Sequence, residues 1–537
     1  MHPVCSISEL LEMIFSTLDD QANASNAQVC KQWGECALNV MWRDVTDFRR
    51  LLCILAPLKK LQDISSGPGT ASIIRYMFAR PPEASDWKRF DRYRHRVRRL
   101  LCSIQPTPKC AIDLSVFDDI ARTRTSLNIF PNLLTLRWNT RLHSCIVFMH
   151  ENVTDVRLCF AQSEQGSTGF REVAFRMPRI TRLELQANFS SQPLAAEAIS
   201  MIRGLKSLRE VILPRYMPTA GLYEALSGLP DLDTVSASHW LCNGSHPREL
   251  AVTRPPLTGD AFQSLSHLET GIRFDDAIYL FNLLSDASKV RTLRLDSPEH
   301  ATPACIQDLL VVTARLMPFL EELQLVSCLC NFTITDDPVV QNSIITVHTL
   351  RPLFKCSHIR ILRLLLPHPV SLLESDVEEL ARAWPALENL ALNSQPKYIS
   401  HCPLDIRALV HLARHCPELA HVALFIGAAI PTPGSAVEYP VFRKLELFHA
   451  GFSDIDDPGA IALFLSRILP LGSGVCNSVL WGPTPNLLPT IVRTILGRIE
   501  KWKKVNEILP LLLQARLEER ERKLSVIKSK GEGSDCL

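Results

Sequence analysis

The sequence lacks the segments that would carry it into or across a membrane. No window approaches the eighteen or so uninterrupted apolar residues of a membrane span, because the best stretches, near 361–373 and 419–430, are short and broken or flanked by polar residues. The N-terminus has no basic segment before an apolar one, and Glu9 and Glu12 interrupt it early. A secretory signal is therefore not expected, and we expect the protein in the cytoplasm, the nucleus or both.

An excess of charge of one sign is also missing. The chain has 58 Lys+Arg against 56 Asp+Glu, a net charge of +2, which is too balanced to draw the whole molecule to nucleic acid. The basic segment 80–99 carries Trp87, Phe90 and Tyr93, and such a mixture can bind nucleic acid by charge and stacking. A solvated helix with its aromatic side chains packed inwards is the simpler interpretation, so nucleic-acid binding is not expected.

The motifs of common enzyme classes are absent too. There is no phosphate-binding glycine loop, no G-x-S-x-G and no H-E-x-x-H. The seventeen cysteines are scattered without paired C-x-x-C spacing, and we interpret them as reduced core residues. Possible metal ligands all have a simpler explanation at the end of a strand or helix: Cys328, Cys330, His401, Cys402, His415, Cys416, Asp454, Asp456 and Asp457. We predict no catalytic residue, metal or cofactor.

The first 45 residues contain two segments with apolar residues at helical spacing. The first segment runs from Ile7 to Leu18, and the second from Val29 to Trp42. Ser6 and Glu9 have the spacing of a capping box at the start of the first helix. Two short helices cannot cover all of these apolar side chains by packing on each other, so another surface should pack there.

The ordered strings I-S-E-L-L-E-M-I-F-S-T-L-D, V-C-K-Q-W and M-W-R-D-V, within residues 6–45, resemble the F-box, the docking motif of Skp–cullin–F-box ubiquitin ligases. The family usually has proline after the first apolar residue, where this chain has Ser8. The alternative is a pair of core helices that cap the rest of the fold. The resemblance implies that some of the apolar residues form a small three-helix core and the others bind in the groove of the Skp adaptor. It does not show which residues belong to which group. The residues are Ile7, Leu10, Leu11, Ile14, Phe15, Leu18, Val29, Cys30, Trp33 and Trp42.

Beyond the N-terminus a six-residue pattern recurs, Φ-x-x-Φ-x-Φ, in which Φ is apolar. Its copies begin at residues 97, 133, 153, 180, 208, 232, 265, 290, 320, 359, 387, 419 and 442, with an average step of about 29 residues, as in leucine-rich repeats. A proline stands two residues before six of the copies: Pro131, Pro230, Pro318, Pro385, Pro417 and Pro440. Proline ends a preceding helix and favours an extended chain, which supports strands at these places.

Helical periodicity fills most gaps between the copies, so strand and helix alternate. This predicts an α/β leucine-rich-repeat solenoid, a curved parallel sheet with helices on the convex face, preceded by a small all-α F-box. The expected divisions are an F-box at 1–50, a helical linker and N-terminal cap at 51–96, the solenoid at 97–475, a C-terminal helical cap at 476–523 and a disordered tail at 524–537. In the C-terminal cap we expect Trp502, Ile508, Leu512 and Leu513 to be buried.

Residues between the apolar positions of each strand should point into the concave face. They form a set of mixed charge: Arg137, Arg157, Glu184, Arg294, Gln324, Arg363, His421, Lys444 and Glu446. A phosphate backbone requires a surface of one sign. A protein target is therefore the expected ligand of this face.

Together these features predict a non-enzymatic substrate-recognition adaptor of a ubiquitin ligase. The F-box would dock on the Skp adaptor, and through it on a cullin, while the repeats hold a target protein for ubiquitin transfer by other subunits. One alternative is a leucine-rich-repeat scaffold with no ligase role. Another is a hydrolase with its site in the insertion 237–262, but we find no nucleophile, base and orienting group there.

Overall fold

The computed structural model describes residues 7–62, 74–102, 110–139, 142–160, 169–187, 194–238, 254–257, 260–327, 334–338, 343–400, 404–427, 439–477 and 488–531. The chain divides into two compact units. The first comprises Met1–Glu249 with Phe262–Ser264, and the second Leu250–Ala261 with Leu265–Leu537. Within the described residues no helix is both long and apolar enough to cross a membrane.

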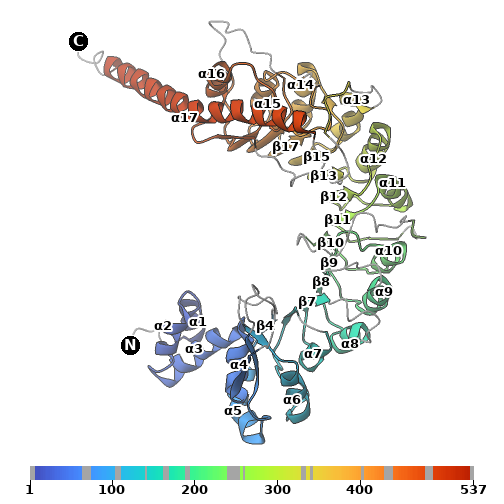
Figure 1. Ribbon diagram of the computed structural model, residues 1–537, viewed down its shortest axis with the longest axis vertical. Coiled ribbons are helices and arrows are strands. Elements are labelled where there is room, and N and C mark those ends of the chain that lie inside the picture. The colour runs from blue at the N-terminus through green and yellow to red at the C-terminus, as the bar shows by residue number, and fades with distance from the viewer. Residues whose placement is uncertain are drawn as a thin grey trace. The chain divides into compact units, whose positions relative to one another are not determined.

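Three helices open the first unit: α1 (Ser8–Phe15), α2 (Asp20–Asn26) and α3 (Lys31–Arg43) (Figure 1). Asp19 caps α2, because its side chain accepts a hydrogen bond of 2.8 Å from the amide of Ala22. Directly after α3 the chain becomes extended as β1 (Asp44–Val45), which pairs in parallel with β4 (Arg99–Cys102). The sheet of the repeats therefore begins inside the segment predicted to be a separate helical motif.

The segment 51–96, predicted as a helical linker and N-terminal cap, contains strands as well as helices. It contains the end of α4 (Phe48–Leu55), the strands β2 (Leu58–Gln62) and β3 (Ile74–Phe78), and α5 (Ala84–Arg94). Strand β3 pairs antiparallel with β2 and parallel with β5 (Cys110–Ile112), which gives a separate three-stranded sheet. These strands are stabilised by pairing between distant segments, which local apolar periodicity does not reveal.

Among its described residues, the first unit has seven parallel strands that follow one another in the sheet in chain order. After β1 and β4 come β6 (Thr135–Trp138), β7 (Asp155–Phe160), β8 (Arg182–Ala187), β9 (Glu210–Leu213) and β10 (Thr234–Ala237). The helices between them lie on one face of the sheet, as Figure 1 shows: α6 (Ser115–Thr123), α7 (Leu142–Cys145), α8 (Gly169–Arg176), α9 (Ala195–Gly204) and α10 (Ala220–Ser227).

The second unit repeats this arrangement. Its parallel strands, in sheet order, are β11 (His267–Gly271), β12 (Thr292–Ser297), β13 (Glu322–Ser327), β15 (Ile361–Leu365), β17 (Asn389–Leu392), β18 (His421–Leu424), β19 (Leu447–His449) and β20 (Gly474–Cys476). Its outer helices are α11 (Phe274–Leu283), α12 (Pro303–Leu316), α13 (Val347–Leu350), α14 (Glu374–Ala383), α15 (Ala408–His415) and α16 (Pro458–Ile468). A separate short pair joins β14 (Ile345–Thr346) to β16 (Val370–Ser371).

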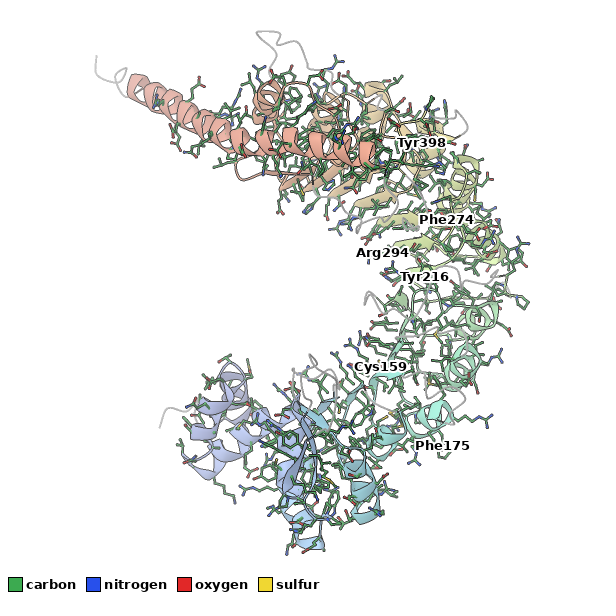
Figure 2. All side chains as sticks on the ribbon, in the orientation of Figure 1. Cys159, Phe175, Tyr216, Phe274, Arg294 and Tyr398 are labelled. Carbon is green, nitrogen blue, oxygen red and sulfur yellow. The ribbon has the colours of Figure 1, made fainter. Side chains whose placement is uncertain are left out.

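The apolar positions of the six-residue pattern form the core between sheet and helices. In β12, for example, Leu293 and Leu295 are 0% and 1% exposed, while Arg294 between them faces the concave side (Figure 2). The alternation follows from the pleat of a strand, which sends successive side chains to opposite faces. Each unit is thus a stretch of leucine-rich-repeat solenoid, and the predicted α/β solenoid with helices on one face of a parallel sheet is confirmed.

A long helix, α17 (Pro489–Gly531), covers the last strand of the second unit. The amide of Val475 in β20 donates a hydrogen bond of 3.3 Å to Asn506 Oδ1. The buried residues of α17 include Ile491, Ile495, Trp502, Val505, Leu509 and Leu513, whereas Ile508 and Leu512 are only half-buried. The helix also continues to Gly531, so the tail predicted to be disordered from residue 524 is helical as far as the structure describes it. An edge strand covered in this way cannot pair with another chain.

Candidate protein-interaction surfaces

The three N-terminal helices share a small core of their own. It is formed by Leu11 and Phe15 of α1 with Cys36 and Ala37 of α3, each at most 2% exposed. Trp33 packs against it, with its ring 5.4 Å from that of Phe15 in an edge-to-face arrangement. Asn23 joins α2 to this core, since its side-chain amide donates a 2.9 Å hydrogen bond to the carbonyl of Phe15.

Beside this core lies a set of exposed apolar side chains, which we call the α1 face. It consists of Ile7 (44% exposed), Met13 (66%), Ile14 (47%), Leu18 (41%) and Val29 (56%). Cys30 is also exposed, and Leu10 is half-buried. The structure thus divides the residues proposed for adaptor binding into core and surface, and it adds the exposed Met13, which lies outside the helical spacing of the other apolar residues.

Trp42 has a different role from the other residues of that set. Its ring lies 5.5 Å from the ring of Tyr93 in α5 and beneath the guanidinium of Arg50, also at 5.5 Å. It therefore faces the first repeat of its own chain and leaves the α1 face free. Glu35 of α3 is paired with Arg96, whose hydrogen bond lowers the pKa of the Glu35 carboxyl group. These contacts join α3 to the start of the solenoid.

The basic segment 80–99 is occupied by contacts within the chain. Arg80 reaches the buried carboxylate of Asp86 at 2.6 Å, and Arg94 donates a 2.9 Å hydrogen bond to the carbonyl of Asn128. Arg99 pairs with Asp44 across β1 and β4 at 2.6 Å. Trp87 and Phe90 are buried, at 3% and 2% exposure. The segment serves as the junction between the N-terminal helices and the repeats.

Ion pairs between neighbouring strands neutralise the concave face of the first unit. Arg157 in β7 reaches Glu184 in β8 at 2.6 Å, and Asp155 is shared by Arg137 at 3.9 Å and Arg182 at 3.3 Å. Side chains directly opposite on adjacent strands are close enough to form such pairs. Three of the residues predicted to bind a target, Arg137, Arg157 and Glu184, are thus already paired with neighbours in the chain.

In the second unit a similar network centres on Arg294, whereas Arg363 has no ion pair among the described residues. Arg294 lies between Glu322 at 2.8 Å and Glu269 at 3.4 Å, and its hydrogen bond with Glu322 raises its pKa. Arg363 in β15 contacts only the amide oxygen of Asn389, at 3.3 Å, within the described residues. Gln324 lies between Arg294 and Arg363 in the strand register.

The register of β19 shows that two of the predicted positions were wrong. Strand register places Val422 opposite Phe448, and Leu445, Phe448 and Ala450 are at most 2% exposed. The six-residue pattern there is therefore 445–450, not 442–447. Lys444 and Glu446 lie before β19 in the chain. Lys444 pairs with Glu418, and the carboxylate of Glu446 lies 3.9 Å from the ring of His421. Both frames contain three apolar residues, and Pro440 favoured the wrong one.

The described residues hold no group of three or more His, Cys, Asp or Glu side chains arranged to bind a metal ion. Burial raises the pKa of the Cys102 and Cys416 thiols to about 12 and that of Cys356 to about 11, so these thiols stay protonated. Asp457 caps α16 by accepting a 2.8 Å hydrogen bond from the amide of Gly459. Cys328, Cys330, His401, Cys402 and most of the insertion 237–262 lie outside the described residues.

The fold and these surfaces define a leucine-rich-repeat protein with a helical N-terminal module. No model of a protein family matches the chain, and no curated protein matches it. Among solved structures it is similar to a chain of the Rad7 and Elc1 complex in yeast, with 12% identity over 66% of this chain and 85% of that chain and a TM-score of 0.32. It is also similar to the leucine-rich-repeat-containing protein LegL7 from Legionella pneumophila, with 13% identity over 61% of this chain and 93% of that chain and a TM-score of 0.30.

Proposed function

We propose that this chain is the substrate-recognition adaptor of a Skp–cullin–F-box ubiquitin ligase. The N-terminal helices dock on the Skp adaptor, and through it on a cullin, while the repeats bind a protein target. The observation that carries the proposal is the α1 face, which stays exposed beside a core already complete without it. The resemblance of residues 6–45 to the F-box names the partner that would cover it.

The contacts of Trp42 argue against a cap that serves only the solenoid. The N-terminal helices are joined to the repeats through Trp42, Glu35 and β1. The residues of the α1 face do not contribute to these contacts. Covering one aliphatic side chain completely contributes about 1.5–3 kcal/mol. Five exposed apolar residues on and beside one short helix therefore offer substantial binding free energy to a partner with an apolar groove.

No residue of the chain performs chemistry in this proposal. The adaptor acts by proximity, since it raises the effective concentration of the target's lysines near a ubiquitin-loaded enzyme. Such a role places the protein in the cytoplasm or the nucleus, where the ligase works.

The first experiment is co-purification of the full-length chain with a purified Skp adaptor, alongside the double variant Ile14→Asp and Leu18→Asp. Both side chains are more than 40% exposed, so the fold should tolerate the change while charge in an apolar groove opposes docking. We expect binding to weaken by at least roughly a hundredfold. Leu11→Asp or Phe15→Asp would not be informative, because these residues form the core.

The matched control is Leu127→Asp, which places the same charge on an apolar residue that is 76% exposed between α6 and β6. It should bind the adaptor as the unmodified chain does, and circular dichroism should give all three proteins the same melting curve. An intact chain that does not bind the adaptor, or a double variant that binds equally well, would favour the repeat scaffold with no ligase role.

A further inference from the structure

The strand register sets a row of side chains across the concave face of the second unit. These are the residues between the last two apolar positions of each pattern, and each lies opposite the next: Glu269 and Arg294, Arg294 and Gln324, Gln324 and Arg363, Arg363 and Ala391, Ala391 and Ala423, Ala423 and His449. The row changes character along the sheet. From β11 to β13 its side chains form an ion-pair network, and at β17 and β18 its side chains are the short, apolar ones of Ala391 and Ala423.

Arg363 stands where this change occurs, and its contacts differ from those of the other arginines in such rows. Arg137, Arg157 and Arg294 each reach a carboxylate on a neighbouring strand. Arg363 has only the 3.3 Å contact from its Nε to Asn389 Oδ1 among the described residues. A guanidinium has five N–H donors in a planar fork that matches a carboxylate, and the part of the chain that the structure describes uses one of them.

Apolar, partly exposed side chains lie near Arg363 on the concave face, together with the polar Gln324 opposite it and Glu322 and Asn389 on either side of Ile361. Val326 and Leu365 lie opposite each other in the register, and Ile361 is two residues before Arg363 on the same side of β15. Beyond the short Ala391, the next strand places Ala423 in the row. We call the six partly exposed residues Gln324, Val326, Ile361, Arg363, Leu365 and Ala423 the concave patch.

We propose that the concave patch binds a segment of the target protein in which an aspartate or glutamate stands beside apolar side chains. The carboxylate would pair with Arg363, the apolar side chains would cover Val326, Ile361 and Leu365, and the Gln324 amide would meet the segment's backbone. A phosphorylated segment fits less well, because phosphate groups are recognised by clusters of basic residues, whereas Arg363 is the single basic residue of the patch. This proposal rests on the part of the proposed function that assigns target capture to the repeats.

The test uses the full-length chain and a phage-displayed library of random linear peptides. We expect the selected peptides to contain an acidic residue next to apolar ones. The affinity of the strongest peptide is then measured for the unmodified chain and for Arg363→Ala. Loss of a charge-assisted, partly buried pair should weaken binding roughly ten- to a hundredfold.

The matched control is Arg360→Ala, which removes an arginine of the same repeat that is paired with Glu388 at 2.6 Å and is half exposed. An exposed pair contributes little to stability, so this variant should keep both fold and peptide affinity. Charge reversal provides a further check, since Arg363→Glu should bind the peptide in which lysine replaces the acidic residue.

Three outcomes would overturn the proposal: no enriched peptide, enriched peptides without an acidic residue, or equal affinity for Arg363→Ala and the unmodified chain. The assay contains no Skp adaptor. Failure of adaptor docking through the α1 face therefore leaves the peptide result unchanged, and the two proposals can fail separately.

Discussion

Gly451 is a position where the backbone leaves no room for a side chain. Its φ is 55°, and a Cβ atom there would lie 1.9 Å from the carbonyl oxygen of Ser394. Gly472 also has a positive φ, 89°, but a Cβ there would meet nothing within 4 Å. Substituting alanine at Gly472 therefore tests the energetic cost of the positive φ alone, whereas substituting it at Gly451 adds the cost of a steric clash.

We therefore expect Gly472→Ala to lower the free energy of unfolding by about 1 kcal/mol, the cost of a left-handed angle alone. Gly451→Ala should cost roughly 3 kcal/mol or more, because the loop after β17 must also move. Denaturant unfolding followed by circular dichroism measures both values. Equal losses in the two variants would mean that Ser394 can shift freely.

The apolar residues in and just after α1 show what sequence can and cannot predict at this scale. Leu11, Ile14, Phe15 and Leu18 share one helical stripe, so periodicity marks all four as apolar-face residues. Only Leu11 and Phe15 meet Cys36 and Ala37 of α3. Which part of a wide stripe is covered depends on the position of the neighbouring helix, and spacing within one helix carries no information about that position.

Among the elements, α17 has the clearest single task. The ring of Trp502 lies 5.9 Å from that of Phe448 in β19, and its indole N–H donates a 3.0 Å hydrogen bond to the carbonyl of Ser453. The residue is 1% exposed, whereas Leu511 on the same helix is 72% exposed. The helix thus holds the last two strands through one face.

We expect Trp502→Ala to lower the free energy of unfolding by about 3–5 kcal/mol, the usual cost of emptying a buried tryptophan site. Leu511→Ala should change it by less than about 0.5 kcal/mol. Hydrogen exchange should also become faster in β20 of the Trp502 variant, because its edge loses protection. Unchanged exchange in β20 would show that the strand does not need the helix.

The elements also mark the limit of what the sequence pattern predicts. Strands with the six-residue pattern, such as β12, were predictable because alternating burial forces apolar residues to fixed positions. Strands β2, β3 and β5 lie outside that pattern and form by pairing with one another. In the last repeat, Phe442, Leu445 and Leu447 fit the pattern as well as Leu445, Phe448 and Ala450, and only the register with β18 decides between them.

On the scale of the whole molecule, the near-zero net charge is matched by local pairing of charges. The arginines of the concave face in the first unit are neutralised across strands, so this face has little field of its own. The α1 face and the concave patch belong to different units and share no residue. Effects of substitutions at sites without common partners usually add, so each binding event should be unaffected by variants of the other.

Ubiquitin transfer, in contrast, should need both surfaces at once. In a reconstituted ligase, a lysine-bearing carrier protein that displays the selected acidic peptide should be modified in the presence of the unmodified chain. Ile14→Asp with Leu18→Asp should abolish this transfer while peptide affinity stays constant, and Arg363→Ala should reduce it while adaptor binding stays constant. Transfer that survives either change would mean that proximity to the ligase is established elsewhere on the chain, because a tethered reaction stops when either link is lost.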